Sequence, residues 1–359
     1  MRVIFKTDYD QDLRLFRHGG AVLWYAVLGA ALLLAPWAVG EYWLSQLAFV
    51  CVYGMAGIGL MLLSGYAGQI SLGHAAFFAA GAYTETLLLT HGWPFPLTLL
   101  AAGLLAGAVG VAIGLPALRL SGIYLAIATL AFAFIVEEIL ARWESVTNGN
   151  NGLSVPVARI GPIAFDPSGR LFYYLALAAV VLLMLGAINL LRSPTGRAFV
   201  AVRDSEIAAQ SMGVNLAWYK TVAFGVSAAF TGVAGAFYAH KLQFISPEAF
   251  TLVLSIELLV MVVVGGLGSL HGAIYGAAFI IVLPEAIGVA KDHLPASIAG
   301  QPGLKSLVFG LVVIGFMLFE PLGIYGRWRK IQLYFQLFPL YRRATFRRQR
   351  SYLRTERLR

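Results

Sequence analysis

Charged residues are scarce in this chain of 359 residues. Asp, Glu, Lys and Arg together make up 12%, about half of the roughly 25% that is usual in soluble domains. Hydrophobic residues make up 59% of the chain, which excludes a soluble enzyme and a disordered linker protein. Because about 20 apolar residues suffice to cross a bilayer, we predict an all-α integral membrane protein. Cysteine is nearly absent as well, and the single Cys51 excludes an internal disulfide framework.

Several chemical motifs are also missing. No lysine follows a glycine, so the chain lacks a GxxxxGK[ST] phosphate loop and cannot hydrolyse ATP by that route. It has no HExxH motif and no Cys/His cluster with metal-ligand spacing. We therefore predict neither a cofactor nor a bound metal, and we do not expect an enzyme. The remaining features indicate passage of a solute through a membrane.

The apolar runs predict about ten membrane spans, with eight or nine as alternatives. The predicted spans cover residues 21–39, 46–64, 74–90, 95–115, 122–141, 171–192, 219–239, 252–267, 271–289 and 303–320. Ten spans place both termini on one side, and that side holds 20 Lys and Arg residues against 6 on the other. This positive-inside bias predicts cytoplasmic termini. We divide the chain into an N-terminal tail (1–20), a transmembrane permease domain (21–320) and a basic C-terminal tail (321–359).

The C-terminal tail carries most of the excess positive charge. From Arg327 to the end it has 11 basic residues and one acidic residue, Glu356. A basic run could bind nucleic acid, but beside membrane spans it is more typical of contact with anionic lipid headgroups. We predict membrane lipids as its partner, and no nucleic acid.

Polar groups inside the apolar regions are candidates for a translocation path. The segment Gly65–His74 has three glycines and no charged residue apart from its histidine, so it predicts a helix broken at membrane depth. A tight cytoplasmic turn with a helix-capping histidine is the alternative. Carboxylates are costly in lipid and often functional there, whereas His240 and His271 are expected to be interfacial and structural. The path candidates are Gln69, Ser71, His74, Glu85 and Glu257.

The loop 193–218 contains the most specific pattern. Asp204 can cap a short helix, Glu206 suits its first turn, and Gly213 can adopt the left-handed conformation that ends it. A helix this short is not stable alone in water, so it must pack against something. A groove in a partner protein is one possibility, and the membrane surface is the other.

These segments resemble a known family. Glu206-x-Ala208-Ala209-x3-Gly213 resembles the EAA-type coupling loop of permeases from ATP-binding-cassette importers. Residues 65–84, 219–238 and 265–272, with the basic tail, resemble the branched-chain amino-acid permease family. The resemblance implies a multi-pass subunit of the bacterial inner membrane that pairs with a second permease subunit. Two cytoplasmic ATPase subunits would dock on the coupling loops, and a periplasmic binding protein would deliver leucine, isoleucine or valine. The residues implied in ATPase coupling are Arg197, Arg203, Asp204, Glu206, Ala208, Ala209 and Gly213.

The sequence leaves three alternatives open. The same architecture could carry another small solute, such as urea or short amides. A secondary transporter could couple transport to protons through Glu85, Glu257 and His74. A membrane-embedded enzyme would need catalytic groups clustered at one membrane face, and local motifs indicate none.

Overall fold

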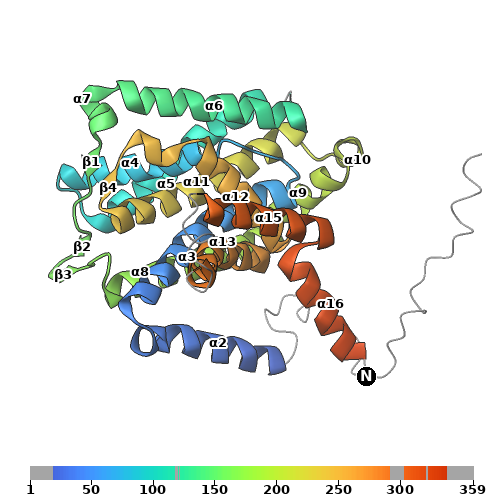
Figure 1. Cartoon of the computed structure of the whole chain (residues 1–359). Coiled ribbons are helices and arrows are strands. Elements are labelled where there is room, and N and C mark those ends of the chain that lie inside the picture. Colours follow the sequence, from blue (N-terminus) through green and yellow to red (C-terminus); the bar gives the residue numbers. More distant parts are fainter. Residues whose placement is uncertain (1–18, 118–119, 121, 292–302, 321, 338–359) are drawn as a thin grey trace, which may run out of the picture.

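A computed structural model describes residues 19–117, 120, 122–291, 303–320 and 322–337. The chain is almost entirely helical over these residues (Figure 1). Its longer α-helices are α2 Gly19–Ala38, α3 Glu41–Leu60, α4 His74–Thr90, α5 Phe95–Ala117, α6 Ile123–Arg142, α8 Arg170–Arg192, α11 Leu216–Leu242, α12 Leu252–Gly265, α13 Leu270–Lys291, α15 Leu304–Phe319 and α16 Gly323–Leu337. The helix α3 continues into a π-helix, η1 (Met61–Tyr66).

Each predicted span coincides with one of the helices from α2 to α15. Among the described residues, seven helices are long and apolar enough to cross a membrane, and the bent pair α15–α16 would make an eighth. The all-α membrane fold is therefore confirmed. The helix α2 falls outside that group because its apolar stretch, Val22–Ala38, is shorter, and α4 has only 17 residues.

The long helix α11 is the centre of the bundle. It packs against α5, α4 and α3, while α2 and α6 lie at opposite edges (Figure 1). Glycines allow the closest of these contacts: a Cβ added to Gly81 on α4 would lie 2.0 Å from the carbonyl oxygen of Gly232 on α11. The buried core includes Phe78, Phe237 and Met261.

Two ends of the bundle differ in structure. At one end, β1 (Leu153–Ser154) pairs antiparallel with β4 (Phe244–Ile245), and β2 (Arg159–Ile160) pairs with β3 (Ile163–Ala164). We call this end the hairpin face. The opposite end, the α10 face, carries α9 (Pro194–Asp204) and α10 (Glu206–Ser211) (Figure 1). Because β1 and β4 come from different inter-span loops, their pairing supports the predicted alternation of the spans.

Part of the expected basic tail forms a helix. The helix α16 covers Gly323–Leu337, within the region that we expected to be a tail only. Its sequence explains this, because Ile324, Trp328 and Ile331 recur at the spacing that places apolar side chains on one helical face. Residues 1–18 of the predicted N-terminal tail (1–20) and residues 338–359 of the C-terminal tail lie outside the described residues.

Candidate functional site

The segment 193–218 forms two short helices rather than one. Ser193 caps α9, and its Oγ accepts a hydrogen bond from the Gly196 backbone N–H at 3.5 Å. Ser205 adopts an extended conformation that ends α9, and its Oγ accepts from the Ala208 N–H at 3.3 Å. Asp204, which we expected to cap the second helix, is instead the last residue of α9. The serine replaces it because the chain turns at Ser205.

The two short helices differ in how they are attached. On α9, Phe199 and Val202 are buried, and Phe199 packs in a cluster with Leu63, Phe77 and Phe224. On α10, by contrast, Ile207 is 84% exposed and Met212, which follows the helix, is 87% exposed. The first helix is therefore fixed to the bundle, while the second presents large apolar side chains to the outside.

Charged residues hold α10 in place. Glu206 Oε1 lies 2.7 Å from the Nζ of Lys220, and the Lys220 side chain is only 6% exposed. Gly213 follows α10 and has a φ of +84°, which is the left-handed helix exit that we predicted. An open cleft of about 490 Å³ lies between α10 and the start of α11, lined by residues that include Glu206, Gln210 and Lys220.

The remaining predicted coupling residues lie along the same two helices. Arg197 is exposed, and its Nη1 donates to the carbonyl oxygen of Arg192 at 3.1 Å. Ala208 is exposed, whereas Ala209 is buried. Arg203 binds the neighbouring Asp204 and also reaches Gly65, on a distant part of the chain. The structure thus brings all seven residues into one segment on the α10 face.

The segment Gly65–His74 is broken inside the bundle. The π-helix η1 ends at Tyr66, and α4 begins at His74. His74 Nε2 lies 2.8 Å from the Oγ of Ser227, which is about 17 Å along α11 from its first residue at 1.5 Å per residue. His74 Nδ1 lies 2.9 Å from the Oγ of Ser71. The break therefore runs from Gly68 and Ile70, which are exposed, to His74, which lies at depth in the bundle.

Three of the predicted path residues meet in this break, and all are buried. Gln69 is 5% exposed, Ser71 1% and His74 0%. The buried Oε1 of Gln69 has no hydrogen-bond partner. The Leu72 N–H donates to Thr129 on α6 at 3.0 Å, and the Ala75 N–H donates to Ser255 on α12 at 2.9 Å. Hydrogen bonds thus join the break and the start of α4 to α6, α11 and α12.

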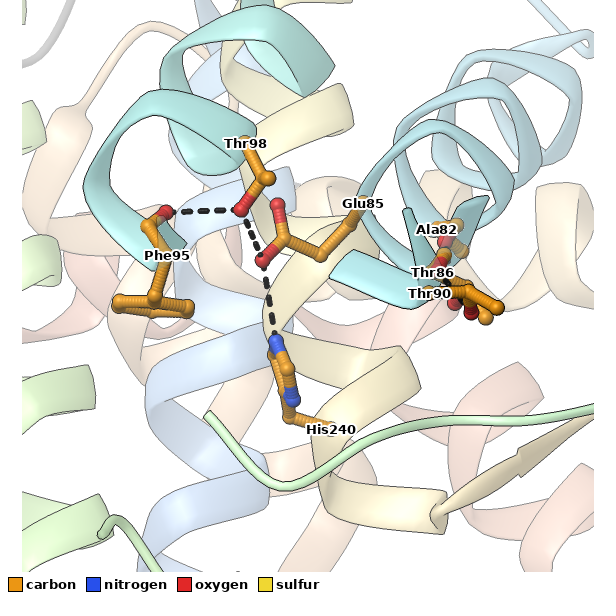
Figure 2. A network of polar contacts seen from close by, with 7 residues as sticks. All are labelled: Ala82, Glu85, Thr86, Thr90, Phe95, Thr98 and His240. Atoms are coloured by element: carbon orange, nitrogen blue, oxygen red, sulfur yellow. Dashed lines mark hydrogen bonds and ion pairs between the residues drawn. The ribbon is translucent and has the colours of Figure 1, made fainter. Parts of the chain in front are cut away.

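Glu85 belongs to a separate buried cluster with Thr98 and His240 (Figure 2). Its Oε1 accepts a hydrogen bond from Thr98 Oγ1 at 2.8 Å and lies 3.1 Å from His240 Nε2. Glu85 is fully buried and His240, near the end of α11, is 3% exposed. Pairing with a carboxylate allows both groups to be buried. Thr98 was missed, since no local motif links it to the other two.

Glu257 lies on α12 and is half-buried. It interacts electrostatically with the hydroxyl groups of Tyr53 on α3 and Tyr238 on α11. It is the one predicted path residue that this structure leaves partly accessible. His271, which we expected to be interfacial, lies 2.8 Å from the hydroxyl of Tyr25 and stacks on Tyr325. Over the described part of the chain, no group of three or more His, Cys, Asp or Glu residues could hold a metal ion.

Comparison with known proteins gives consistent matches. The family model described as "Branched-chain amino acid transport system / permease component" matches residues 42–317. The chain is 36% identical over 333 residues to the high-affinity branched-chain amino acid transport system permease protein LivM of Escherichia coli K12, covering 85% of this chain and 76% of that protein.

Two further relatives are also permeases of import or transport systems. LivM of Salmonella typhimurium LT2 is 36% identical over 297 residues, covering 76% of this chain and 67% of that protein. The autoinducer 2 import system permease protein LsrC of the same organism is 25% identical over 319 residues, covering 80% of this chain and 82% of that protein. No solved structure matches the chain.

Proposed function

Since this chain belongs to the family of branched-chain amino acid transport permease components, we propose that it is a permease subunit of an ATP-binding-cassette importer. It forms the translocation path for leucine, isoleucine and valine, which a periplasmic binding protein delivers. The observation that carries this proposal is the 36% identity to a named branched-chain amino acid permease over most of both chains.

The comparisons favour this function over the alternatives. A proton-coupled transporter would not share its whole permease region with subunits of import systems. The relative named for autoinducer 2 import indicates that one architecture serves different solutes, so a permease for urea or short amides would have the same fold. The higher identity to the branched-chain amino acid permeases, 36% against 25%, supports branched-chain amino acids.

The proposal includes three kinds of protein partner. A second permease subunit completes the membrane part, two ATPase subunits supply energy, and the binding protein selects the solute. The exposed Ile207 and Met212 support docking of an ATPase subunit on α10, because they have little cover within this chain. We therefore assign the α10 face and both termini to the cytoplasm of a cell with an inner membrane. The permease domain spans residues 21–320, between the two tails.

Burial and contacts indicate which of the five path candidates could face the solute. Glu257 is half-buried between helices and remains the best candidate for a group that faces the solute. Gln69, Ser71 and His74 reach the path only if the break at Gly65–His74 rearranges during transport. Glu85 is enclosed by Thr98 and His240, which supports a structural role.

Co-purification in mild detergent tests the docking of the ATPase. The chain, expressed with its importer subunits, is compared with an Ile207→Glu variant, and mass spectrometry identifies bound subunits that carry a phosphate loop. We expect the intact chain to retain the ATPase and Ile207→Glu to lose it, because the new charge would lie in an apolar contact. Ile163→Glu is the matched control, since Ile163 is exposed on the hairpin face.

Uptake tests the transport itself. In proteoliposomes that contain the assembled complex, labelled leucine should enter only with ATP and the binding protein. Uptake driven by a pH gradient in the absence of ATP would contradict the importer. Failure of leucine, isoleucine and valine to compete, with competition by urea or short amides, would move the function to the other solute class.

A further inference from the structure

Arg203 connects two parts of the fold that are far apart in sequence. It lies at the end of α9, and its Nη1 donates to the carbonyl oxygen of Gly65, in the π-helix η1, at 3.1 Å. The last carbonyls of a helix have no partner within the helix. A charged side chain from the 193–218 segment therefore satisfies the end of α3 just where this central helix unwinds.

The guanidinium group is held from both sides. Its Nε and Nη2 donate to Asp204 Oδ1 at 3.0 and 2.9 Å, which leaves Nη1 directed at Gly65. The rigid fork of arginine makes this double contact possible, and the single ammonium of lysine could not reproduce it. Asp204 thus orients Arg203 in addition to ending α9.

Glycines make room for the arginine. Gly68 has a φ of +70°, and a Cβ added there would lie 2.8 Å from Arg203 Cγ. A Cβ added to Gly268, in the turn between α12 and α13, would lie 3.6 Å from Arg203 Nη1. The Gly268 N–H also donates to the sulfur of Met61 at 3.3 Å. Arg203 therefore lies where the π-helix η1, at the end of α3, meets the turn that follows α12.

We propose that Arg203 is a positioning residue that transmits movement of the ATPase-docking helices to the unwound ends of α3 and α12. This inference rests on the proposed importer function. The helix α10 is exposed on the face where the ATPase would dock. The helix α9 directly precedes it in the chain and contacts it. Through the Arg203–Gly65 contact, a shift of α9 displaces the break that contains Gln69, Ser71 and His74. Arg203 touches neither the solute nor ATP in this arrangement.

The test measures coupling rather than activity alone. The complete importer carrying Arg203→Ala is reconstituted in proteoliposomes, and leucine uptake and ATP hydrolysis are measured in the same preparation. We expect the variant to assemble and to hydrolyse ATP, while uptake per ATP falls about 5- to 150-fold, the range that allosteric coupling spans. Arg142→Ala is the control, because Arg142 is exposed at the end of α6 and pairs with Glu138 on its own helix.

Two further variants address the contact itself. Arg203→Lys keeps the charge but loses the fork, so uptake per ATP should lie between the intact and Arg203→Ala complexes. Gly68→Ala disturbs the same contact, because the added Cβ would lie 2.8 Å from Arg203 Cγ, and it should also uncouple. If Arg203→Ala does not assemble, Arg203→Lys decides the question, and an unchanged ratio there overturns the proposal.

The outcomes separate this inference from the proposed function. If the intact complex shows no ATP-dependent uptake, the importer function itself fails. If the intact complex transports and Arg203→Ala transports equally per ATP, only the role of Arg203 is refuted. A parallel loss of hydrolysis and uptake, with an unchanged ratio, also refutes it, because a merely structural residue would produce that result.

Discussion

Substitutions of Glu85 test whether its carboxyl group only accepts structural hydrogen bonds or also transfers a proton during transport. Glu85→Ala removes the acceptor shared by Thr98 and His240 (Figure 2). Thr98 keeps the carbonyl oxygen of Phe95 at 2.8 Å, but the buried imidazole loses its carboxylate partner. A buried polar group left unsatisfied costs about 1–3 kcal/mol, and the cavity adds to this cost. We expect Glu85→Ala to lose about 2–4 kcal/mol, from these two contributions together.

Glu85→Gln is the informative comparison. Its amide oxygen still accepts from both neighbours, and its amide nitrogen replaces an oxygen, Oε2, that has no hydrogen-bond partner. The loss should therefore stay below about 1 kcal/mol, close to the average interhelical hydrogen bond measured in membranes. ATP-dependent uptake should persist, because no proton needs to leave the carboxyl group.

Two preparations give the two quantities. Unfolding of the purified chain in mixed detergent–SDS micelles gives the free-energy differences, and proteoliposomes that contain the assembled complex give the uptake. Equal destabilisation by Gln and Ala would refute the hydrogen-bond argument and favour an ion pair. Loss of uptake in a stable Glu85→Gln variant would make Glu85 part of the transport mechanism.

Three further predictions follow from packing and capping. Gly81→Ala should lower the free energy of unfolding by about 1–3 kcal/mol, because the added methyl group would force α4 away from α11. Gly310→Ala is the control, since no atom lies within 4 Å of its added Cβ. Thermal unfolding in detergent compares the two variants, and equal destabilisation would exclude tight packing at Gly81. Ser205→Ala should speed amide exchange in α10 by removing a cap worth about 1 kcal/mol, while faster exchange after Asp204→Ala instead would restore Asp204 as the cap. Truncation of residues 342–359 should lower membrane retention or complex yield without abolishing uptake, and normal yield would contradict a lipid-binding tail.

The helix positions were predictable because the membrane imposes a length on each apolar run. All ten predicted spans coincide with helices, since backbone groups in lipid must be satisfied within the segment. The break at Gly65–His74 was predictable as well, from its three glycines. Its depth was not, because that depends on the distant Ser227, which packs against His74.

The contacts within the candidate site were less accessible to prediction. The 193–218 segment was expected to contain one helix capped by Asp204, and Ser205 caps it instead. Both residues are good caps, so local preference could not choose between them, and the packing of α9 through Phe199 decides where the chain turns. The pair of Glu85 and His240 spans 155 positions, a separation at which residue spacing carries no signal.

The helix α4 crosses the bundle although it is too short to meet a simple length criterion. Its 17 residues extend about 25 Å at 1.5 Å per residue, less than the roughly 30 Å of a hydrocarbon core. Yet α3 ends on the α10 face, where Gly65 binds Arg203. The next helix, α5, starts at Phe95, whose ring lies 6.3 Å from that of Phe165, next to β3 on the hairpin face.

The chain between these two points must therefore pass from one face to the other. Residues 67–73 supply the missing length, because non-helical backbone rises up to about 3.3 Å per residue. Such backbone is tolerated at membrane depth only where protein surrounds it, and here α6, α11 and α12 supply its partners. The same break that shortens α4 thus places an irregular segment between the α10 face, where Gly65 binds Arg203, and the interior of the bundle, where His74 binds Ser227.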